Sequence, residues 1–399
     1  MRGLEGRITV VGAGVAGLTC AILLARSGRR VVVREARAQV GRRFHDDFQG
    51  IENWSAEQDV LEELAEAGIR LQCELVPVRE GRVFDPDGKL HRITASRPLY
   101  YLVRRGPAPG SLDRDLLAQA LEAGVEIRFG DPVHRVDGPA ILATGPRRAD
   151  AIAVGYLFET DMPDGDWLAL SNRLAAFGYA YLLVHRGRGT IATCLFTDFE
   201  RQEVYLRRTV AFFRRHADLR MRDPRRFGGY ANFRLPRRAV QGDHPVIGEQ
   251  AGFQDPLAGF GLRYAFRSAI LAAQSLRAGT DYVEAWRGQL LPLMRTGVVN
   301  RFLFDSLGEG GWRRAVGRLA DGDTVRVLRR FYRPSPWSRV LFPLARMVYR
   351  RPLRDPSCHH LDCECVWCRC GLQQNMYARW QISVTSGGRT RPASEGTEK

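Results

Sequence analysis

The hydrophobic positions of the first 35 residues predict a strand, a helix and a second strand. Apolar residues dominate Ile8–Val11, an apolar helical run follows a glycine-rich turn, and residues 31–33 are all valine. A short apolar run bounded by turn residues is typical of a strand buried on both faces. The opening of the chain therefore predicts a βαβ unit of a parallel sheet over residues 7–35.

Helical and strand-like runs continue to alternate up to residue 150. Two amphipathic helical runs, each ended by a glycine, lie at residues 54–68 and 112–123. Strand-like runs lie at residues 71–76, 100–103, 125–129 and 140–145. Because strands that alternate with helices favour a parallel sheet, we expect an α/β fold with a Rossmann-like domain over residues 1–150.

From residue 151 the sequence consists mainly of runs in which apolar and polar residues alternate, as in strands, with one helix expected at residues 199–216. This change predicts an antiparallel β-sheet domain, residues 151–235, inserted into the nucleotide-binding fold. Residues 236–290 should return to that fold, because a glycine-rich turn after Gly248 leads into a helical run at residues 261–277.

The remainder of the chain divides into three segments. The hydrophobic pattern predicts a helical C-terminal region over residues 291–355. Residues 356–372 are rich in cysteine, and residues 381–399 are rich in Ser, Gly, Thr and Arg. The last segment lacks apolar content, so we expect it to be disordered.

The turn after the first strand has the spacing of a dinucleotide fingerprint. Gly12 permits a tight turn, Gly14 leaves room for a pyrophosphate, and Gly17 lets the helix approach the strand. A phosphate would then lie at the helix N-terminus. Glu35 ends the second strand, where its carboxylate can bind a ribose hydroxyl and repel a 2′-phosphate. The pattern predicts FAD or NAD rather than NADP at this position.

Composition narrows the class of protein. The chain has 399 residues, of which 45% are hydrophobic, and no stretch approaches the roughly twenty uninterrupted apolar residues of a membrane-spanning helix. We see no secretory signal pattern and expect a cytoplasmic protein. The net charge of +16 comes mainly from dispersed arginines. This charge should attract anions, but no nucleic-acid-binding module accompanies it, so we do not expect a nucleic-acid partner.

Three distant segments, residues 12–17, 143–145 and 248–261, together resemble the two-dinucleotide-binding-domain flavoproteins. More narrowly, residues 7–290 resemble the geranylgeranyl reductase-like branch, which is related to the aromatic hydroxylase flavoproteins. The resemblance implies FAD as cofactor, bound by residues 1–150 and 236–290, with residues 151–235 as the substrate domain. The implied cofactor-binding residues are Gly12, Gly14, Ala16, Gly17, Glu35, Arg42, Arg43, Arg105, Thr144, Gly145, Glu249, Gly252, Asp255, Gly259 and Gly261.

Individual roles also follow from the resemblance. Glu249 occupies the position of an aspartate that contacts the flavin ribityl chain, and the helix after it points its N-terminus toward the flavin. Gly259 and Gly261 would let backbone amides approach the flavin ring. Asp255 is either a flavin contact or a turn residue.

Several arginines are candidates for the same site. Arg42 and Arg43 match a basic position near the adenine-side phosphates or ribose, with a solvated arginine pair as the alternative. Arg105 matches a flavin-facing arginine, although the segment after it departs from the usual spacing.

The resemblance implies reduction of a carbon–carbon double bond in an apolar, isoprenoid-like substrate, with hydride from the flavin and an external donor such as NAD(P)H. Tyr179 and Tyr181 would line the substrate tunnel, or they are core residues of a sheet. The loop residues His45, Asp46 and Asp47 either face the flavin or are solvated. The chain suggests no catalytic acid or base besides the flavin. The alternatives are a monooxygenase using NAD(P)H and O₂, and an accessory flavin- or metal-binding protein without turnover.

Cysteines are concentrated near the C-terminal end. Five of the eight lie between residues 358 and 370. Thiolates at this spacing suit zinc or an iron–sulfur cluster, so Cys363, Cys365, Cys368 and Cys370 are candidate ligands. The alternative is a set of thiols without a resident metal.

Residues 337–351 combine apolar residues at helical spacing with arginines. A basic amphipathic helix of this kind either lies on an anionic membrane or packs on the protein body with its arginines in water. The first alternative would make the protein a peripheral membrane protein.

Overall fold

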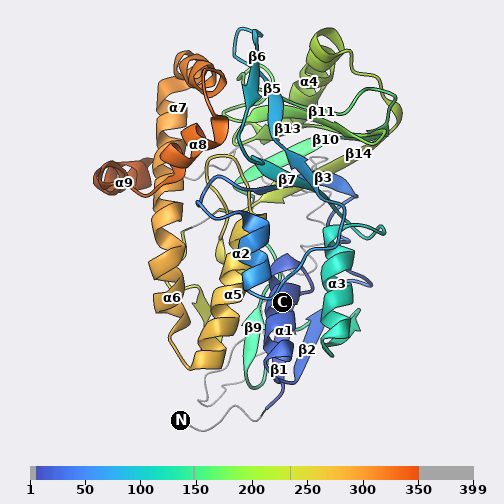
Figure 1. The fold of residues 1–399 in the computed structure, drawn as a ribbon, viewed down its shortest axis with the longest axis vertical. Coiled ribbons are helices and arrows are strands. Elements are labelled where there is room, and N and C mark those ends of the chain that lie inside the picture. The colour runs from blue at the N-terminus through green and yellow to red at the C-terminus, as the bar shows by residue number, and fades with distance from the viewer. Residues whose placement is uncertain (1–5, 147–148, 234, 350–399) are drawn as a thin grey trace, which may run out of the picture.

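The computed structural model describes residues 6–146, 149–233 and 235–349 and has an α/β architecture with two main sheets (Figure 1). Its strands are β1 (Ile8–Val11), β2 (Val31–Glu35), β3 (Asp47–Glu52), β4 (Val76–Val78), β5 (Glu80–Phe84), β6 (Leu90–Thr94), β7 (Tyr100–Arg105), β8 (Glu126–Phe129), β9 (Ala140–Leu142), β10 (Ala151–Glu159), β11 (Gly165–Ala169), β12 (Tyr179–His185), β13 (Arg188–Leu195), β14 (Arg222–Ala231), β15 (Val240–Gln241) and β16 (His244–Pro245). Its helices are α1 (Val15–Arg26), α2 (Val60–Glu66), α3 (Leu112–Glu122), α4 (Gln202–Ala217), α5 (Leu262–Ala278), α6 (Tyr282–Gln289), α7 (Leu291–Ala320), α8 (Thr324–Tyr332) and α9 (Pro336–Tyr349), with short 3₁₀ turns η1 (Phe199–Arg201) and η2 (Gly248–Ala251).

The predicted Rossmann-like unit is present as a parallel sheet in the order β8-β2-β1-β9. Val10 and Val33 at its centre are fully buried, as expected for strands covered on both faces. Helix α1 packs against both α3 and α5. The expected βαβ unit is therefore confirmed.

A second segment of chain returns to the end of this sheet. The β15-β16 hairpin runs alongside β9, and the Ile247 amide donates to the Leu142 carbonyl at 2.9 Å. This contact carries the glycine-rich turn of residues 248–261 to the carboxyl edge of the parallel sheet. Figure 1 shows α5, which follows the turn, beside α1.

The larger sheet has seven strands in the order β14-β10-β13-β12-β11-β5-β6. Along β12, Ala180 and Leu182 belong to the core that the sheet forms with α4, whereas the alternate residues Tyr179 and Tyr181 point to the opposite face. Helix α4 thus covers one face and leaves the other face toward the parallel sheet. A three-stranded sheet, β3-β7-β4, lies between these units.

Strands β5 and β6 belong to the seven-stranded sheet but come from residues 80–94. The pairing of β5 with β11, which joins this hairpin to the sheet, was not expected. The Asp85 carboxylate closes their hairpin by accepting hydrogen bonds from the Asp87 and Lys89 amides, both at 3.0 Å. The Pro86-Asp87-Gly88 sequence is a recognisable turn signal, so the hairpin itself could have been found from the sequence.

Two other expectations were wrong in their boundaries. The helix expected from residue 54 begins at Val60, because Asp59 caps it through the Leu61 amide at 2.9 Å. The strand expected over residues 71–76 is absent except for its last residue. The Asp115 carboxylate on α3 accepts hydrogen bonds from the Gln72 and Cys73 amides, which removes them from strand pairing.

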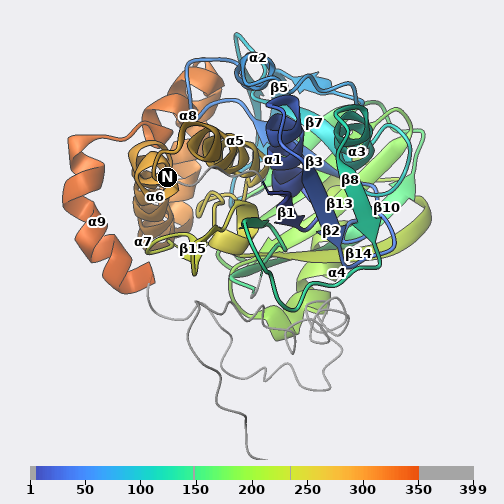
Figure 2. The same cartoon turned by 90° about the horizontal axis from the view of Figure 1, so that it is seen from below.

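The C-terminal helices form a separate layer at one side of the molecule (Figures 1 and 2). Helix α7 is interrupted at Gly308, whose φ of 54° and ψ of −162° are not helical, and α9 packs against α7 at the outer edge in both views. Among the described residues, no helix is both long and apolar enough to cross a membrane.

The predicted metal ligands Cys363, Cys365, Cys368 and Cys370, and the tail of residues 381–399, lie outside the described residues. Within residues 6–146, 149–233 and 235–349, no group of three His, Cys, Asp or Glu side chains is placed to hold a metal ion.

Candidate functional site

A cavity of about 1220 Å³ extends from the carboxyl edge of the parallel sheet to the seven-stranded sheet and to helices α7 and α8. Among the sequence-predicted site residues, its walls include Gly12, Gly14, Ala16, Glu35, Arg42, Arg43, His45, Asp47, Arg105, Thr144, Gly145, Tyr179, Tyr181, Glu249, Gly259 and Gly261. Asp46, Gly17, Gly252 and Asp255 do not line it. Drug-sized ligand pockets typically measure about 300–1000 Å³. The cavity is therefore larger than a typical pocket for one small ligand.

The polar end of the cavity is built around the first turn. A Cβ on Gly12 would lie 2.4 Å from the Ala143 carbonyl oxygen, and a Cβ on Gly17 would lie 2.0 Å from the Gly12 carbonyl oxygen. Both positions therefore require glycine for close backbone packing. A Cβ on Gly14 would meet no protein atom within 4 Å. The space in front of Gly14 is open to a ligand.

Glu35 is held in place at the end of β2. Its carboxylate accepts hydrogen bonds from the Ala13 amide at 2.7 Å and from the Arg37 amide at 2.9 Å, one on each oxygen. A carboxylate oxygen can accept more than one hydrogen bond, so both can still bind ribose hydroxyls. Glu35 thus joins the glycine turn to the edge where a ribose would lie.

Two helix N-termini are directed at the cavity. Gly14 precedes α1 and Gly261 precedes α5, and neither helix has a capping side chain or an acidic residue in its first turn. An uncapped N-terminus carries a partial positive charge and free N–H groups. The arrangement suits anionic groups at this end of the cavity.

Arg43 and Glu249 form an ion pair that the sequence did not suggest. Their side chains meet at 2.5 Å, and Arg43 also donates to the Tyr230 carbonyl at 2.6 Å. Glu249 accepts a further hydrogen bond from the Asn232 amide at 3.2 Å. Burial lowers the pKa of the Arg43 guanidinium, but Glu249 outweighs this effect and raises it overall. The pair ties the loop after β2 to the seven-stranded sheet and to the glycine-rich turn.

The small-residue turn after β9 is fixed by a neighbouring side chain. The Thr144 amide donates to the Gln250 side-chain oxygen at 2.7 Å, and Gly145 has a φ of 87°. Gln250 belongs to the η2 turn, so the second and third segments of the predicted pattern are directly connected. The sequence did not single out Gln250.

Asp255 organises the turn before α5 from behind the cavity wall. Its carboxylate accepts hydrogen bonds from the Ala258 amide at 2.8 Å, the Leu257 amide at 3.2 Å and the Tyr332 hydroxyl at 2.9 Å. Burial raises its pKa to about 6, although the hydrogen bonds from Ala258, Tyr332 and Leu257 favour the charged form. The geometry is that of a turn residue.

Arg105 lies at the cavity wall in a bidentate ion pair with buried Asp113, with distances of 2.9 and 3.0 Å. Its guanidinium lies 4.1 Å from the centre of the Phe44 ring. Arg42 also lines the cavity, and its carbonyl accepts a hydrogen bond from Arg37 at 2.6 Å. Asp113 therefore fixes the position of Arg105, a contact that no local sequence pattern predicts.

The other end of the cavity is largely apolar. Tyr179 and Tyr181 project from β12, and their ring centres are 6.3 Å apart. The Tyr179 hydroxyl donates to the Ala258 carbonyl at 2.5 Å, which connects the seven-stranded sheet to the glycine-rich turn. The wall continues over hydrophobic residues of α7 and α8, namely Leu303, Phe304, Leu307, Trp312, Ala315, Val316, Leu319, Leu328 and Phe331.

Two of the carboxyl groups that line the cavity have raised pKa values. Burial raises the pKa of Asp166, against the effect of His185, which lies 3.1 Å away. Burial also raises the pKa of Asp47, which accepts hydrogen bonds from the His45 amide at 3.0 Å and from Gln49 at 2.9 Å. Burial thus shifts both carboxyl groups at the cavity wall toward the protonated form.

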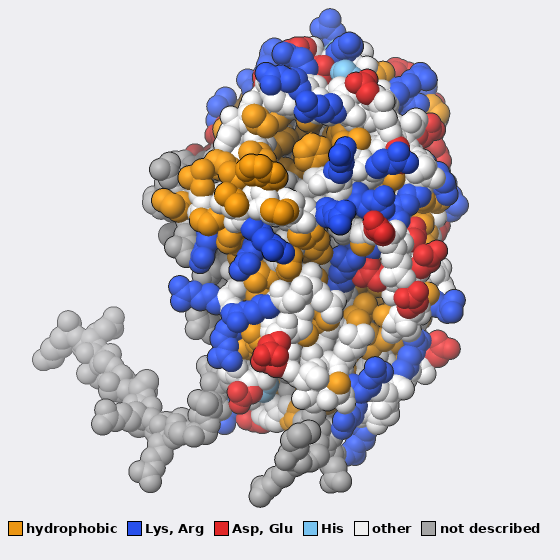
Figure 3. Space-filling model, turned by 60° about the vertical axis from the view of Figure 1, so that its left-hand side comes forward, with side chains coloured by type: hydrophobic (Ala, Val, Ile, Leu, Met, Phe, Trp, Pro, Cys, Tyr) orange, Lys and Arg blue, Asp and Glu red, His pale blue; other side chains and the backbone are white. Residues whose placement is uncertain are grey.

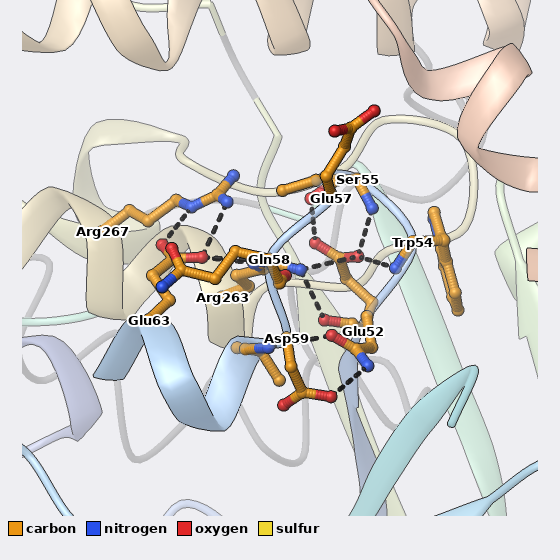
Figure 4. Close-up of polar contacts among 12 residues, drawn as sticks. Glu52, Trp54, Ser55, Glu57, Gln58, Asp59, Glu63, Arg263 and Arg267 are labelled. Carbon is orange, nitrogen blue, oxygen red and sulfur yellow. Dashed lines mark hydrogen bonds and ion pairs between the residues drawn. The ribbon is translucent and has the colours of Figure 1, made fainter. Parts of the chain in front are cut away.

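A buried polar cluster fixes α5 relative to the loop between β3 and α2 (Figure 4). Arg263, which is almost fully buried, donates to Glu63 at 2.5 and 3.0 Å, and Arg267 donates to the same carboxylate at 2.5 and 2.8 Å. Glu52 closes the adjacent loop by accepting hydrogen bonds from the Trp54 and Ser55 amides, both at 3.0 Å. The cluster positions the N-terminal half of α5, which begins at the cavity.

Comparisons with known proteins agree with the fold. The family described as NAD(P)-binding Rossmann-like domain matches residues 10–52, and no curated protein matches the sequence significantly. A geranylgeranyl bacteriochlorophyll reductase-like protein from Thermoplasma acidophilum has a TM-score of 0.67 at 16% identity, covering 85% of this chain and 100% of that chain. A probable FAD-dependent monooxygenase from Pseudomonas aeruginosa, PqsL, has a TM-score of 0.56 at 18% identity, covering 79% of this chain and 100% of that chain. This chain has the fold of FAD-dependent oxidoreductases.

Proteins of this fold have different activities. The flavin-dependent brominase Bmp2 has a TM-score of 0.60 at 16% identity, covering 87% of this chain and 100% of that chain. The three similar structures cover between 79% and 87% of this chain.

The residues at the polar end fit the cofactor of this fold. Gly14 leaves open space, α1 and α5 begin without capping side chains, and Glu35 is oriented by backbone amides. In addition, the Gln254 side-chain oxygen is buried at the cavity wall without a hydrogen-bond partner among the described residues. Such an atom needs a partner. FAD lying along Gly14 and the 248–261 turn would be held by these groups.

Proposed function

We propose that the protein is an FAD-dependent oxidoreductase that reduces a carbon–carbon double bond of an apolar, isoprenoid-like substrate. The observation that supports this best is the division of one cavity into two ends. One end has the glycine turns and the N-termini of α1 and α5, and the other has hydrophobic walls from the sheet, α7 and α8. A dinucleotide and an apolar molecule could therefore occupy the same cavity.

FAD, when bound, supplies hydride chemistry. The chain's own contribution is to hold the two molecules and exclude water, since the N-termini of α1 and α5 favour negative charge and the hydrophobic end favours an apolar tail. Reduction of a double bond also requires a proton for the second carbon. Asp166 lines the cavity and burial raises its pKa, so we propose this carboxyl as the group that supplies the proton. The reductant is an external donor such as NAD(P)H.

A second candidate is an FAD-dependent monooxygenase that uses NAD(P)H and O₂. The similar fold of PqsL favours this alternative, and the cavity would equally admit an apolar aromatic substrate. In either reaction Tyr179 and Tyr181 would form part of the wall around the substrate.

Anaerobic spectroscopy of the purified holoprotein distinguishes these activities. The flavin is reduced chemically, oxygen is excluded, and geranylgeraniol is added as the probe alkene. Reoxidation of the flavin together with a hydrogenated product identified by mass spectrometry is the expected result. A product that forms only after oxygen is admitted, and that carries an oxygen atom from O₂, would favour the monooxygenase. A folded protein that takes up no FAD on reconstitution would contradict both.

A further inference from the structure

The outer face of α9 is apolar where a surface helix is normally polar. The inner face of α9 packs on α7 through Leu341, Phe342 and Ala345. Trp337, Val340, Leu344 and Met347 follow one another at helical spacing on the side that faces solvent, and Trp337 and Met347 are 75% and 70% exposed. A helix with one buried face does not need a second apolar stripe for folding.

Exposed hydrophobic residues next to α9 enlarge this surface. Phe331 on α8 and Leu307 on α7 are both exposed, and both also line the cavity. Figure 3 shows hydrophobic side chains gathered over this side of the molecule around a hollow, with Lys and Arg side chains nearby. The hydrophobic end of the cavity therefore opens on the same side as α9.

The charge of the same segment has one sign. Residues 324–349 contain arginine at several positions and no Asp or Glu. Arg330, Arg333, Arg339 and Arg346 are exposed, and none of them pairs with an acidic side chain within the described part of the chain. Arginines without acidic partners beside an apolar stripe are complementary to a lipid bilayer, which has a hydrophobic interior and negatively charged headgroups.

We propose that the α9 face, defined as Phe331, Trp337, Val340, Leu344 and Met347, docks on an anionic lipid surface. The apolar side chains enter the boundary between headgroups and acyl chains, where tryptophan is favoured, and the arginines contact the lipid phosphates. The cavity mouth at Leu307 and Phe331 then faces the lipid. Entry of an apolar substrate from the bilayer is a consequence that rests on the proposed function, whereas docking itself does not require any reaction.

Vesicle flotation of the full-length holoprotein tests the proposal. We expect binding to vesicles of phosphatidylcholine with phosphatidylglycerol and weak binding to phosphatidylcholine alone. Each arginine near an anionic surface contributes about 1 kcal/mol, so the double variant Arg339→Gln/Arg346→Gln should bind anionic vesicles roughly 30-fold more weakly. The double variant Trp337→Ser/Leu344→Ser should bind anionic vesicles at least tenfold more weakly, because it lacks the apolar side chains that enter the bilayer.

Matched controls keep the test specific. Arg207→Gln/Arg214→Gln removes the same charge from the exposed side of α4, and Leu121→Ser removes an exposed leucine from α3. Both should bind vesicles like the unaltered protein, and circular dichroism with flavin absorbance shows whether every variant is folded. Equal losses in the α4 and α9 variants, or no loss in the α9 variants, would overturn the proposal.

Oxidation of Met347 by hydrogen peroxide, mapped by mass spectrometry, distinguishes lipid from protein as the occupant. Met347 should be oxidised readily in solution and protected only when anionic vesicles are present. Protection without vesicles would mean that a second copy of the chain or another part of the same chain covers the face, and this result would also overturn the proposal. None of these measurements depends on turnover, so failure of the proposed reaction would be seen separately.

Discussion

Gly12 and Gly14 stand two positions apart in the first turn and have opposite physical roles. The φ of Gly12 is 105°, and a side chain there would collide with the backbone of Ala143. Gly14 has an ordinary φ of −81° and open space where its side chain would be. The protein needs the first glycine to fold, whereas the second leaves space that only a ligand would use.

This contrast predicts different outcomes for two alanine variants. Gly12→Ala should lower the free energy of unfolding by roughly 3 kcal/mol or more, through the strained φ and the clash with Ala143. Gly14→Ala should change it by less than about 1 kcal/mol while weakening FAD binding at least tenfold. Urea unfolding of the apoprotein and flavin fluorescence titration measure the two quantities. An unchanged FAD affinity in Gly14→Ala would contradict the placement of the pyrophosphate.

Asp255 predicts a dependence of stability on pH. Its pKa is about 6 in the folded protein, against an ordinary value of 3.8, because it is buried. Folding therefore favours the protonated form, so the stability contribution is complete below about pH 4 and is lost as the pH rises through 6. The difference corresponds to roughly 3 kcal/mol.

The variant Asp255→Asn cannot ionise and should lack this loss between pH 4.5 and pH 7. Denaturant unfolding of both proteins at the two pH values gives the comparison. Other buried carboxyls such as Asp47 and Asp166 titrate in both proteins. The contribution of Asp255 is therefore the difference between the two proteins in how far the free energy of unfolding changes from pH 4.5 to pH 7. An equal change in both proteins would show that Asp255 is not the responsible group.

At the residue scale, the sequence selected residues that line one cavity but did not predict the contacts between them. Glu249 was selected for a ribityl contact and Arg43 for a contact near the adenine-side phosphates or ribose, and both line the cavity. Their ion pair spans 206 positions in the chain and no local pattern predicts it. The roles of such residues depend on partners that only the fold brings together.

At the scale of elements, local patterns were sufficient where a hydrophobic run had turn residues on both sides. The expected strands at residues 125–129 and 140–145 are β8 and β9, and the expected helix at residues 261–277 is α5. Pairing between distant strands was not predictable, and β5 illustrates why. Its edge contacts β11 more than 80 residues later, in parallel register, and nothing in either run specifies the other.

The cluster around Glu63 is a second contact of this kind, and it predicts a large loss of stability. Two arginines of α5 donate to Glu63, and Arg263 has a side chain only 1% exposed. Removing the carboxylate leaves a buried cation without its main partner, which typically costs about 3–5 kcal/mol. Glu63→Ala should lower the free energy of unfolding by this amount, as measured by urea denaturation.

Glu62→Ala is the matched control for this prediction. Glu62 is exposed on the same turn of α2, and its replacement should change the free energy of unfolding by no more than about 0.5 kcal/mol. A similar effect in both variants would mean that α2 needs a carboxylate for its own stability, and that the link to α5 contributes little.

At the scale of the whole molecule, the site belongs to no single unit. The parallel sheet supplies the glycine turn, the seven-stranded sheet supplies the tyrosines, and α7 and α8 close the hydrophobic end. Side-chain contacts connect these units, and a contact that reaches the glycine-rich turn should couple the two ends of the cavity. Tyr179 makes such a contact, because its hydroxyl donates to the Ala258 carbonyl in the turn before α5.

Tyr179 and Tyr181 therefore provide a matched pair of variants. Both lie on the cavity face of β12, but a hydrogen bond to the glycine-rich turn is made by Tyr179. Tyr179→Phe removes an interaction worth about 1 kcal/mol and frees the turn that would contact the flavin, so FAD affinity should fall about fivefold. Tyr181→Phe keeps the ring and should leave FAD affinity unchanged. Fluorescence titration of both apoproteins is the measurement. Equal affinities for the two variants would mean that the sheet does not position the turn, and that the two ends of the cavity act independently.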